Sequence, residues 1–216
     1  MDFFTIQGQG YDSNIYVLLG EKPTIVDTGT GFHSKEILKQ ISIKIKPSTL
    51  HQIILTHEHY DHVGGVNDFR QFSKNNAQIV AHKHTNTKLT AGQSSFAEML
   101  GGVMPQITVD VELHGGEQLL LGDELFTVIY TPGHSKGSIC LYGGTSKSLI
   151  SGDTIFAHGD YGRYDFPGGS LPELVSSIHR LTSLDIINLY PGHGEVVEGE
   201  GKNHVLKSYQ NIKMTI

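Results

Sequence analysis

Residues 56–65, with the sequence THEHYDHVGG, place three histidines and two acids within six positions and end in a glycine pair. The apolar run at 53–55 before this stretch predicts a buried strand, and Val66, Phe69 and Phe72 recur after it at helical spacing. We therefore expect the polar residues in a loop at the carboxyl end of a strand. In open α/β sheets this is where ligands bind.

The residue types in this stretch are those of a metal site. Imidazole and carboxylate are ligands that Zn²⁺ prefers, and they also suit iron and manganese. His57 and His59 stand two apart, so in extended backbone their side chains project to one side and can share one ion. Asp61 and His62 follow closely and can face a second ion. The alternative is a histidine-rich polar loop exposed to solvent.

Further candidate ligands follow three apolar, strand-like runs farther along the chain. They are His134 in TPGHSKGS, Asp153 in ISGDTIF and His193 in LYPGHGE. Each stands beside a glycine, which lets the backbone turn sharply after the strand. Taken singly, each residue is more typical of a turn. Taken together with the earlier stretch, in this order, they form a specific signal of a metal centre.

With HxHxDH followed by PGH, GD and PGH, the sequence resembles the metallo-β-lactamase superfamily of hydrolases, most closely its glyoxalase II-like branch. The resemblance implies an α/β fold, an αββα sandwich of two mixed β-sheets face to face with helices outside. It implies two divalent metal ions, with zinc favoured and iron or manganese as alternatives. The implied ligands are His57, His59 and His134 for the first ion, Asp61, His62 and His193 for the second, and Asp153 bridging both.

Two further residues are candidates for supporting roles. Asp27 ends a predicted strand, where an acid can fix the tautomer of a ligand imidazole; the alternative is an Asp-Thr-Gly turn and nothing more. Arg163 lies in GRYDFPGG, which resembles the GRxDxPGG pattern of small glyoxalase II-like proteins. Its guanidinium can bind a substrate carboxylate through paired hydrogen bonds, or it can order its own loop through Asp165. Both interpretations stay open.

The remaining pattern predicts a single domain over residues 1–216 with two pseudo-repeated halves, about 1–107 and 108–216. Amphipathic helices are expected over 34–43, over 201–212, and after a capping box formed by Ser170 and Glu173. Residues 92–107 are irregular. We expect the apolar side chains there, Phe96, Met99 and Leu100, in the core, with a flexible wall or a dimer contact as alternatives.

Composition and charge narrow the class of protein. The net charge of −6 gives no basic field for nucleic acid, so no nucleic-acid partner is expected. Cys140 is the one cysteine and its strand-like setting predicts a buried thiol. The first residues lack the pattern of a signal peptide, and no apolar run reaches membrane-spanning length. We expect a cytoplasmic protein that acts on a small-molecule substrate without a membrane; a homodimer stays open.

The implied chemistry is hydrolysis of a thioester, or of a related ester or lactone, by a hydroxide held between two metal ions. Asp61 is the expected catalytic group, both binding metal and orienting the hydroxide. A thiolate leaving group has a pKa of about 8.5 and needs little protonation, which favours a thioester over a β-lactam. The main alternative is a mononuclear Fe(II) persulfide dioxygenase using His57, His134 and Asp153. A binding or redox module without turnover, or a superfamily member acting on RNA, are weaker alternatives.

Overall fold

The computed structural model describes residues 2–93 and 96–215, so residues 94 and 95 of the irregular segment lie outside the described residues. The chain divides into two compact units. Unit 1 comprises the described residues up to 113 together with 120–124, and unit 2 comprises residues 114–119 and those from 125 onward. That the whole chain is one domain with two pseudo-repeated halves stays a prediction.

Unit 1 is built on a six-stranded sheet with the strands in sequence order, β1 to β6. The first three strands pair antiparallel and the last four pair parallel, so the sheet is mixed. β2, β3 and β4 are buried along their whole length, and strands of this kind read as nearly continuous apolar runs. The strands are β1 (Phe3–Ile6), β2 (Ile15–Leu18), β3 (Thr24–Val26), β4 (Gln52–Leu55), β5 (Gln78–His82) and β6 (Val111–Leu113).

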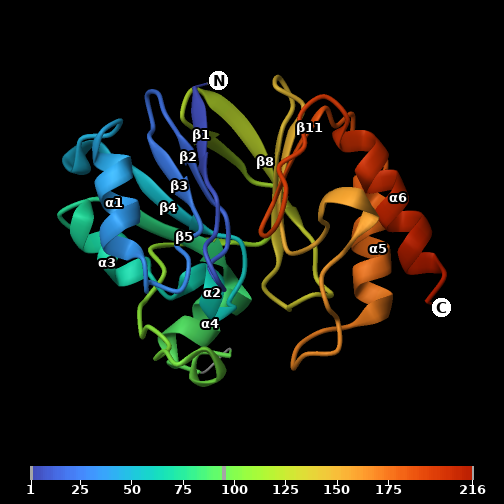
Figure 1. The fold of residues 1–216 in the computed structure, drawn as a ribbon, viewed down its shortest axis with the longest axis horizontal. Helices are drawn as coiled ribbons and strands as arrows, with labels where there is room; N and C mark the ends of the chain where they lie inside the picture. Colours follow the sequence, from blue (N-terminus) through green and yellow to red (C-terminus); the bar gives the residue numbers. More distant parts are fainter. Residues whose placement is uncertain (1, 94–95, 216) are drawn as a thin grey trace. The chain divides into compact units, whose positions relative to one another are not determined.

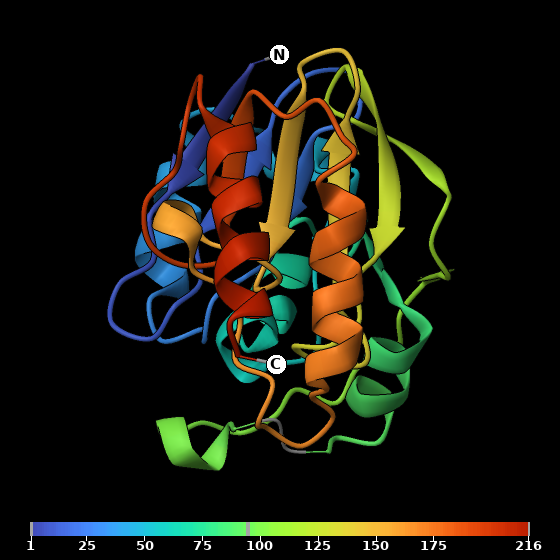
Figure 2. The same cartoon turned by 90° about the vertical axis from the view of Figure 1, so that its right-hand side faces the viewer.

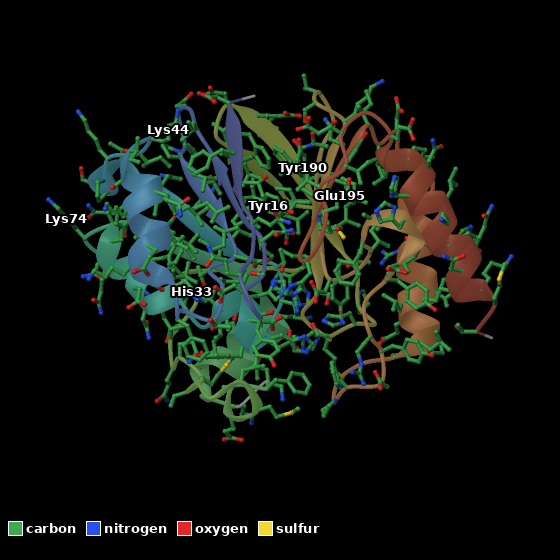
Figure 3. The ribbon with its side chains drawn as sticks, viewed as in Figure 1. Tyr16, His33, Lys44, Lys74, Tyr190 and Glu195 are labelled. Atoms are coloured by element: carbon green, nitrogen blue, oxygen red, sulfur yellow. The ribbon has the colours of Figure 1, made fainter. Side chains whose placement is uncertain are left out.

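Helices α1 and α3 lie on the same side of this sheet (Figure 1). Their apolar stripes, with Ile37 and Ile41 on α1 and Val66 and Phe69 on α3, are buried in the core of unit 1. In Figure 3 the lysines labelled on this unit reach outward, whereas Tyr16 lies within it. The helical elements are α1 (Ser34–Ser42), η1 (Pro47–Thr49), α2 (Tyr60–Val63), α3 (Val66–Phe72), α4 (Lys83–Thr90) and η2 (Glu98–Leu100).

Unit 2 contains most of a second sheet, with the strand order β11-β10-β9-β8-β7. β8, β9 and β10 pair antiparallel, and β10 and β11 pair parallel, so this sheet is also mixed. The strands are β7 (Gln118–Leu121), β8 (Glu124–Tyr130), β9 (Ile139–Gly143), β10 (Ser148–Gly152) and β11 (Asn188–Pro191).

Two helices, α5 (Leu171–Leu181) and α6 (Gly201–Lys213), run side by side over this sheet, and a short 3-10 turn, η3 (Ala157–Gly159), lies against α6 (Figure 2). The predicted cap of α5 is present, because the Ser170 hydroxyl accepts the Glu173 N–H at 3.4 Å. Leu174, Ile178 and Leu181, the apolar stripe of this helix, are buried in the core of unit 2.

Two mixed β-sheets flanked by helices confirm the predicted fold class. Two local expectations were wrong. Met99 is 79% exposed and lies outside the core, because η2 turns its outer face to solvent while Leu100 packs inward. The loop predicted after β4 instead contains the one-turn helix α2. Within residues 2–93 and 96–215, every helix is too short or too polar to cross a membrane.

Candidate metal centre

In unit 1 the HxHxDH stretch starts where β4 ends at Leu55. The backbone then bends over residues 56–58, and His59, itself extended, is the N-cap of α2, which places Asp61 and His62 on a helical turn. Glycine is required directly after α2. A Cβ at Gly64 would lie 2.3 Å from the Thr30 carbonyl oxygen, and one at Gly65 would lie 2.4 Å from that of Thr28. The glycine pair therefore lets the loop after β3 pass against the turn that carries the candidate ligands.

The three imidazoles of this stretch lie against one another and are almost completely buried. His57 Nε2 stands 3.1 Å from His59 Nδ1, and the ring centroids of His57 and His62 are 4.1 Å apart. Two nitrogens bound to one tetrahedral zinc ion at about 2.0–2.1 Å each would be roughly 3.3 Å apart. The His57–His59 pair is therefore spaced as two ligands of a single ion.

Asp27 and Thr56 fix which nitrogen of two imidazoles carries the proton. Asp27 Oδ1 accepts the Thr56 N–H, and Oδ2 accepts the Thr56 hydroxyl, each at 2.8 Å. His62 Nδ1 stands 2.8 Å from the same Oδ2, so it carries the proton and Nε2 keeps its lone pair. Because the Thr56 hydroxyl donates to Asp27, its oxygen accepts from His57 Nδ1 at 3.1 Å, which leaves His57 Nε2 unprotonated as well.

Asp61 presents its carboxylate beside His62. Asp61 Oδ2 lies 3.8 Å from His62 Nε2, and the Asp61 side chain is 21% exposed. The carboxylate therefore reaches the same region as a buried imidazole lone pair while staying accessible to water. An oxygen and a nitrogen donor at this separation suit one hard or borderline cation.

Sequence reasoning missed Asp12, a buried acid that braces this part of unit 1. Its Oδ1 accepts the Thr30 N–H at 2.8 Å, and its Oδ2 stands 2.6 Å from Nδ1 of His33, which is labelled in Figure 3. The next residue, Ser13, donates its N–H to the Asp61 carbonyl at 3.0 Å. An acid in a short polar segment resembles any polar turn, so nothing in the sequence distinguished it.

In unit 2, His134 is oriented by the backbone of the loop that follows Asp153. His134 Nδ1 stands 2.7 Å from the Arg163 carbonyl oxygen. A carbonyl only accepts, so Nδ1 is the protonated nitrogen and Nε2 keeps its lone pair. This close approach needs glycine beside it, because a Cβ at Gly162 would lie 1.9 Å from the Asp153 carbonyl oxygen and 2.8 Å from His134 Nδ1.

Asp153 stands between the two histidines of unit 2. Its Oδ2 lies 3.5 Å from His134 Nε2 and 3.7 Å from His193 Nε2. β10 and β11 end together here, since Gly192 donates its N–H to the Gly152 carbonyl at 2.7 Å. His193 is the most accessible of the three, with 35% of its side chain exposed. A carboxylate flanked by two imidazoles has the chemistry expected of a bridging ligand.

Arg163 forms an ion pair with Asp165 within its own loop, which is one of the two roles that the sequence left open. Its guanidinium donates twice to Asp165, with Nε to Oδ1 at 3.0 Å and Nη2 to Oδ2 at 2.7 Å, and it stacks 4.1 Å above the Phe166 ring. These hydrogen bonds hold the pKa of the Asp165 carboxyl below its ordinary value. Arg163 and Asp165 are both exposed, and a role for Arg163 toward substrate stays a prediction.

Each unit therefore gathers its own share of the predicted ligands. Unit 1 brings together His57, His59, Asp61 and His62, with Asp27 behind them, and unit 2 brings together His134, Asp153 and His193. The histidine and aspartate clusters can bind metal ions, because their imidazole nitrogens and carboxylate oxygens lie close together. Glu58, which the motif left unassigned, is buried and accepts a hydrogen bond from Thr85 at 3.3 Å.

A family model described as the metallo-beta-lactamase superfamily matches residues 8–193, which is most of the chain. The protein belongs to this superfamily. It is 33% identical over 196 residues to a probable metallo-hydrolase of Methanocaldococcus jannaschii, a match that covers 88% of this chain and 92% of that protein. It is also 28% identical over 218 residues to an acyl-coenzyme A thioesterase of Bos taurus, which covers 88% and 77% of the two chains.

Solved structures show the same relationship. The structure of BLEG-1 B3 metallo-beta-lactamase has a TM-score of 0.80 and 27% identity, covering 94% of this chain and 96% of that one. The structure of TTHA1623 in a di-iron-bound form has a TM-score of 0.75 and 29% identity, covering 93% and 96%. The chain is thus related both to metal-dependent hydrolases and to a protein that holds two iron ions.

Proposed function

We propose that this protein is a metal-dependent thioester hydrolase that works with two divalent metal ions. Zinc is the favoured metal and iron is the next candidate. The proposal rests on which nitrogen of the candidate imidazole ligands carries the proton. His57, His62 and His134 each have Nδ1 engaged by a neighbouring oxygen, which leaves Nε2 to bind metal. Relatives among metallo-hydrolases and acyl-coenzyme A thioesterases support the reaction class.

The candidate ligands are imidazoles and carboxylates, without a thiolate. Such a set of ligands suits two ions of zinc or iron. We assign His57, His59 and His134 to one ion and Asp61, His62 and His193 to the other, with Asp153 shared. When bound, such ions lower the pKa of water toward neutrality and stabilise the oxyanion that develops on the attacked carbonyl.

Asp61 is the proposed catalytic residue. Its carboxylate is partly exposed and stands 3.8 Å from the His62 imidazole, so it can accept a hydrogen bond from an incoming water and orient it. It can then hold the proton that the water gives up. A thiolate leaves without protonation more readily than an amine does, because a thiol has a pKa of about 8.5. This favours a thioester over a β-lactam as the substrate.

Arg163 is the proposed anchor for a carboxylate on the substrate. Its guanidinium donates two hydrogen bonds to Asp165, and the pair is exposed to solvent. Surface ion pairs of this kind contribute little, so an arriving carboxylate can replace Asp165 without a large penalty. In this proposal Asp165 keeps the guanidinium oriented until the substrate arrives, which joins the two interpretations that the sequence left open.

The test compares Asp61→Asn with Glu58→Gln on a panel of a thioester, a lactone, a β-lactam and a persulfide, with dissolved oxygen followed throughout. We expect the thioester to be the best substrate without oxygen uptake, and Asp61→Asn to lower kcat by about a hundredfold or more. Glu58→Gln keeps the acceptor for Thr85 and should retain most of kcat. Stoichiometric oxygen uptake with the persulfide and no thioester hydrolysis would assign the protein to the dioxygenases instead.

A further inference from the structure

The segment of residues 96–103 is a compact turn anchored on the core of unit 1. Ala97 is buried in that core and Leu100 packs against it. The turn closes on itself, because Gly102 donates its N–H to the Ala97 carbonyl at 2.8 Å and Gly101 has a left-handed backbone with φ of 79°. We call these residues the 96–103 segment.

This segment touches the stretch that carries the candidate metal ligands. The Phe96 ring stands edge-on to the His59 imidazole, with the ring centroids 5.1 Å apart. On the other side of the turn, the Gly102 backbone presses against Tyr60, since a Cβ there would lie 2.1 Å from the phenol oxygen. The Val103 backbone hydrogen-bonds that hydroxyl. Residues next to Asp61 thus hold the segment in place.

Two apolar side chains of the segment are exposed beside the acid Glu98. Met99 is 79% exposed and Val103 is 86% exposed, although Ala97 and Leu100 on the same turn face inward. Glu98 is the one charged residue in the segment. Residues 96–103 themselves offer no positive charge to the phosphate groups of a carrier such as coenzyme A, whereas an alkyl chain would bury apolar surface against Met99 and Val103. The chemistry matches the acyl side of a thioester rather than its carrier side.

We propose that the 96–103 segment is the wall that binds the acyl chain, so that the preferred substrates are thioesters of unbranched aliphatic acids of medium or long chain. The inference rests on the proposed function. Phe96, against His59, lies at the reacting end of the chain, and Met99 and Val103 contact carbons farther from the carbonyl. Tyr60 is a positioning residue that ties the wall to the metal-ligand stretch.

The test measures kcat/KM for acetyl, hexanoyl and dodecanoyl thioesters of a small neutral thiol. In the wild type we expect kcat/KM to rise with chain length, by up to roughly fourfold for each methylene that becomes fully buried. The double variant Met99→Ser, Val103→Ser should lower the dodecanoyl-to-acetyl ratio by about tenfold. Ile43→Ser, which alters a side chain of unit 1 that is 77% exposed, is the matched control and should leave this ratio as in the wild type.

A second measurement separates the wall from the reaction. Calorimetry with a dodecyl thioether, which cannot be hydrolysed, should show binding to the metal-free protein with a negative heat-capacity change, and weaker binding to the double variant. Thioester hydrolysis with the same kcat/KM for all chain lengths would rule out acyl-chain binding by the 96–103 segment and would leave the proposed hydrolase function intact. Thioether binding that depends on Met99 and Val103, without any thioester hydrolysis, would support the acyl-chain wall and rule out the proposed hydrolase function. A change from dimer to monomer in the double variant at constant chain-length preference would make this face a subunit contact and overturn the proposal.

Discussion

Asp27 occupies a backbone conformation that most side chains avoid, with φ of 62°. Its two carboxylate oxygens make hydrogen bonds to Thr56 and His62, and these bonds offset the cost of the left-handed backbone. The sequence suggested an acid behind a ligand imidazole, because Asp27 ends an apolar run. The role of Thr56 could not be predicted from the sequence. Its hydroxyl donates to Asp27 and accepts from the His57 imidazole, and only the folded structure brings these three groups together.

Asp27→Asn tests this arrangement at the scale of one residue. Asparagine tolerates the same backbone, but its amide can present an N–H to His62 and so favour the wrong tautomer. We expect metal affinity to fall by about 10- to 100-fold. Competition with a chelator of known affinity measures it, and Asp123→Asn, at an exposed turn, is the control. Equal affinity in the two variants would show that Asp27 merely shapes a turn.

Cys140 gives a prediction about alkaline pH. The thiol is fully buried against Thr131, Thr154 and the Ser151 carbonyl, and burial raises its pKa from 9.0 to about 11. Between these two values the unfolded chain loses the thiol proton and the folded chain keeps it, so stability falls as pH rises. The full loss is about 2 to 3 kcal/mol.

Urea unfolding at several pH values from about 8 to 11 measures this loss. The variant Cys140→Ala should show a shallower decline over the same range, because it lacks the buried thiol. Parallel curves for the variant and the wild type would contradict the assignment. The sequence predicted the burial of this thiol, since it lies in an apolar strand-like run.

At the scale of elements, the loop between β10 and α5 shows how a glycine sets a ligand. Gly162 lets the Arg163 carbonyl reach His134 Nδ1. Gly162→Ala should push this carbonyl away, free the His134 ring to rotate, and lower metal affinity at least about tenfold. Gly144→Ala is the matched control, since a Cβ there meets nothing within 4 Å. If both variants bind metal as the wild type does, the loop does not orient His134.

Elements with a clear period were predicted well. The strand before the HxHxDH stretch and the amphipathic helices α1, α5 and α6 follow from apolar spacing, and the cap at Ser170 marked the start of α5. Prediction failed where a few residues are shaped by their neighbours. The single turn α2 is too short to show periodicity, and Met99 faces outward because Gly101 and Gly102 close the turn beneath it.

At the scale of the whole molecule, each unit has its own apolar core and its own share of the predicted ligands. The order of the motifs along the chain carries the family resemblance that implies seven ligands, and their assignment to ions stays a prediction. It could not reveal the buried acids and carbonyls behind them, which come from distant parts of the same unit. Asp12, against Thr30 and His33, is the clearest example.

The proposed function requires that the seven residues bind two metal ions. Elemental analysis of the chain, after anaerobic reconstitution with zinc, iron or manganese in turn and removal of free metal, tests it most directly. We predict two ions per chain with at least one of these metals, falling to one or fewer in Asp153→Ala, which removes the shared ligand. A maximum of one ion per chain with all three metals would rule out a dinuclear centre.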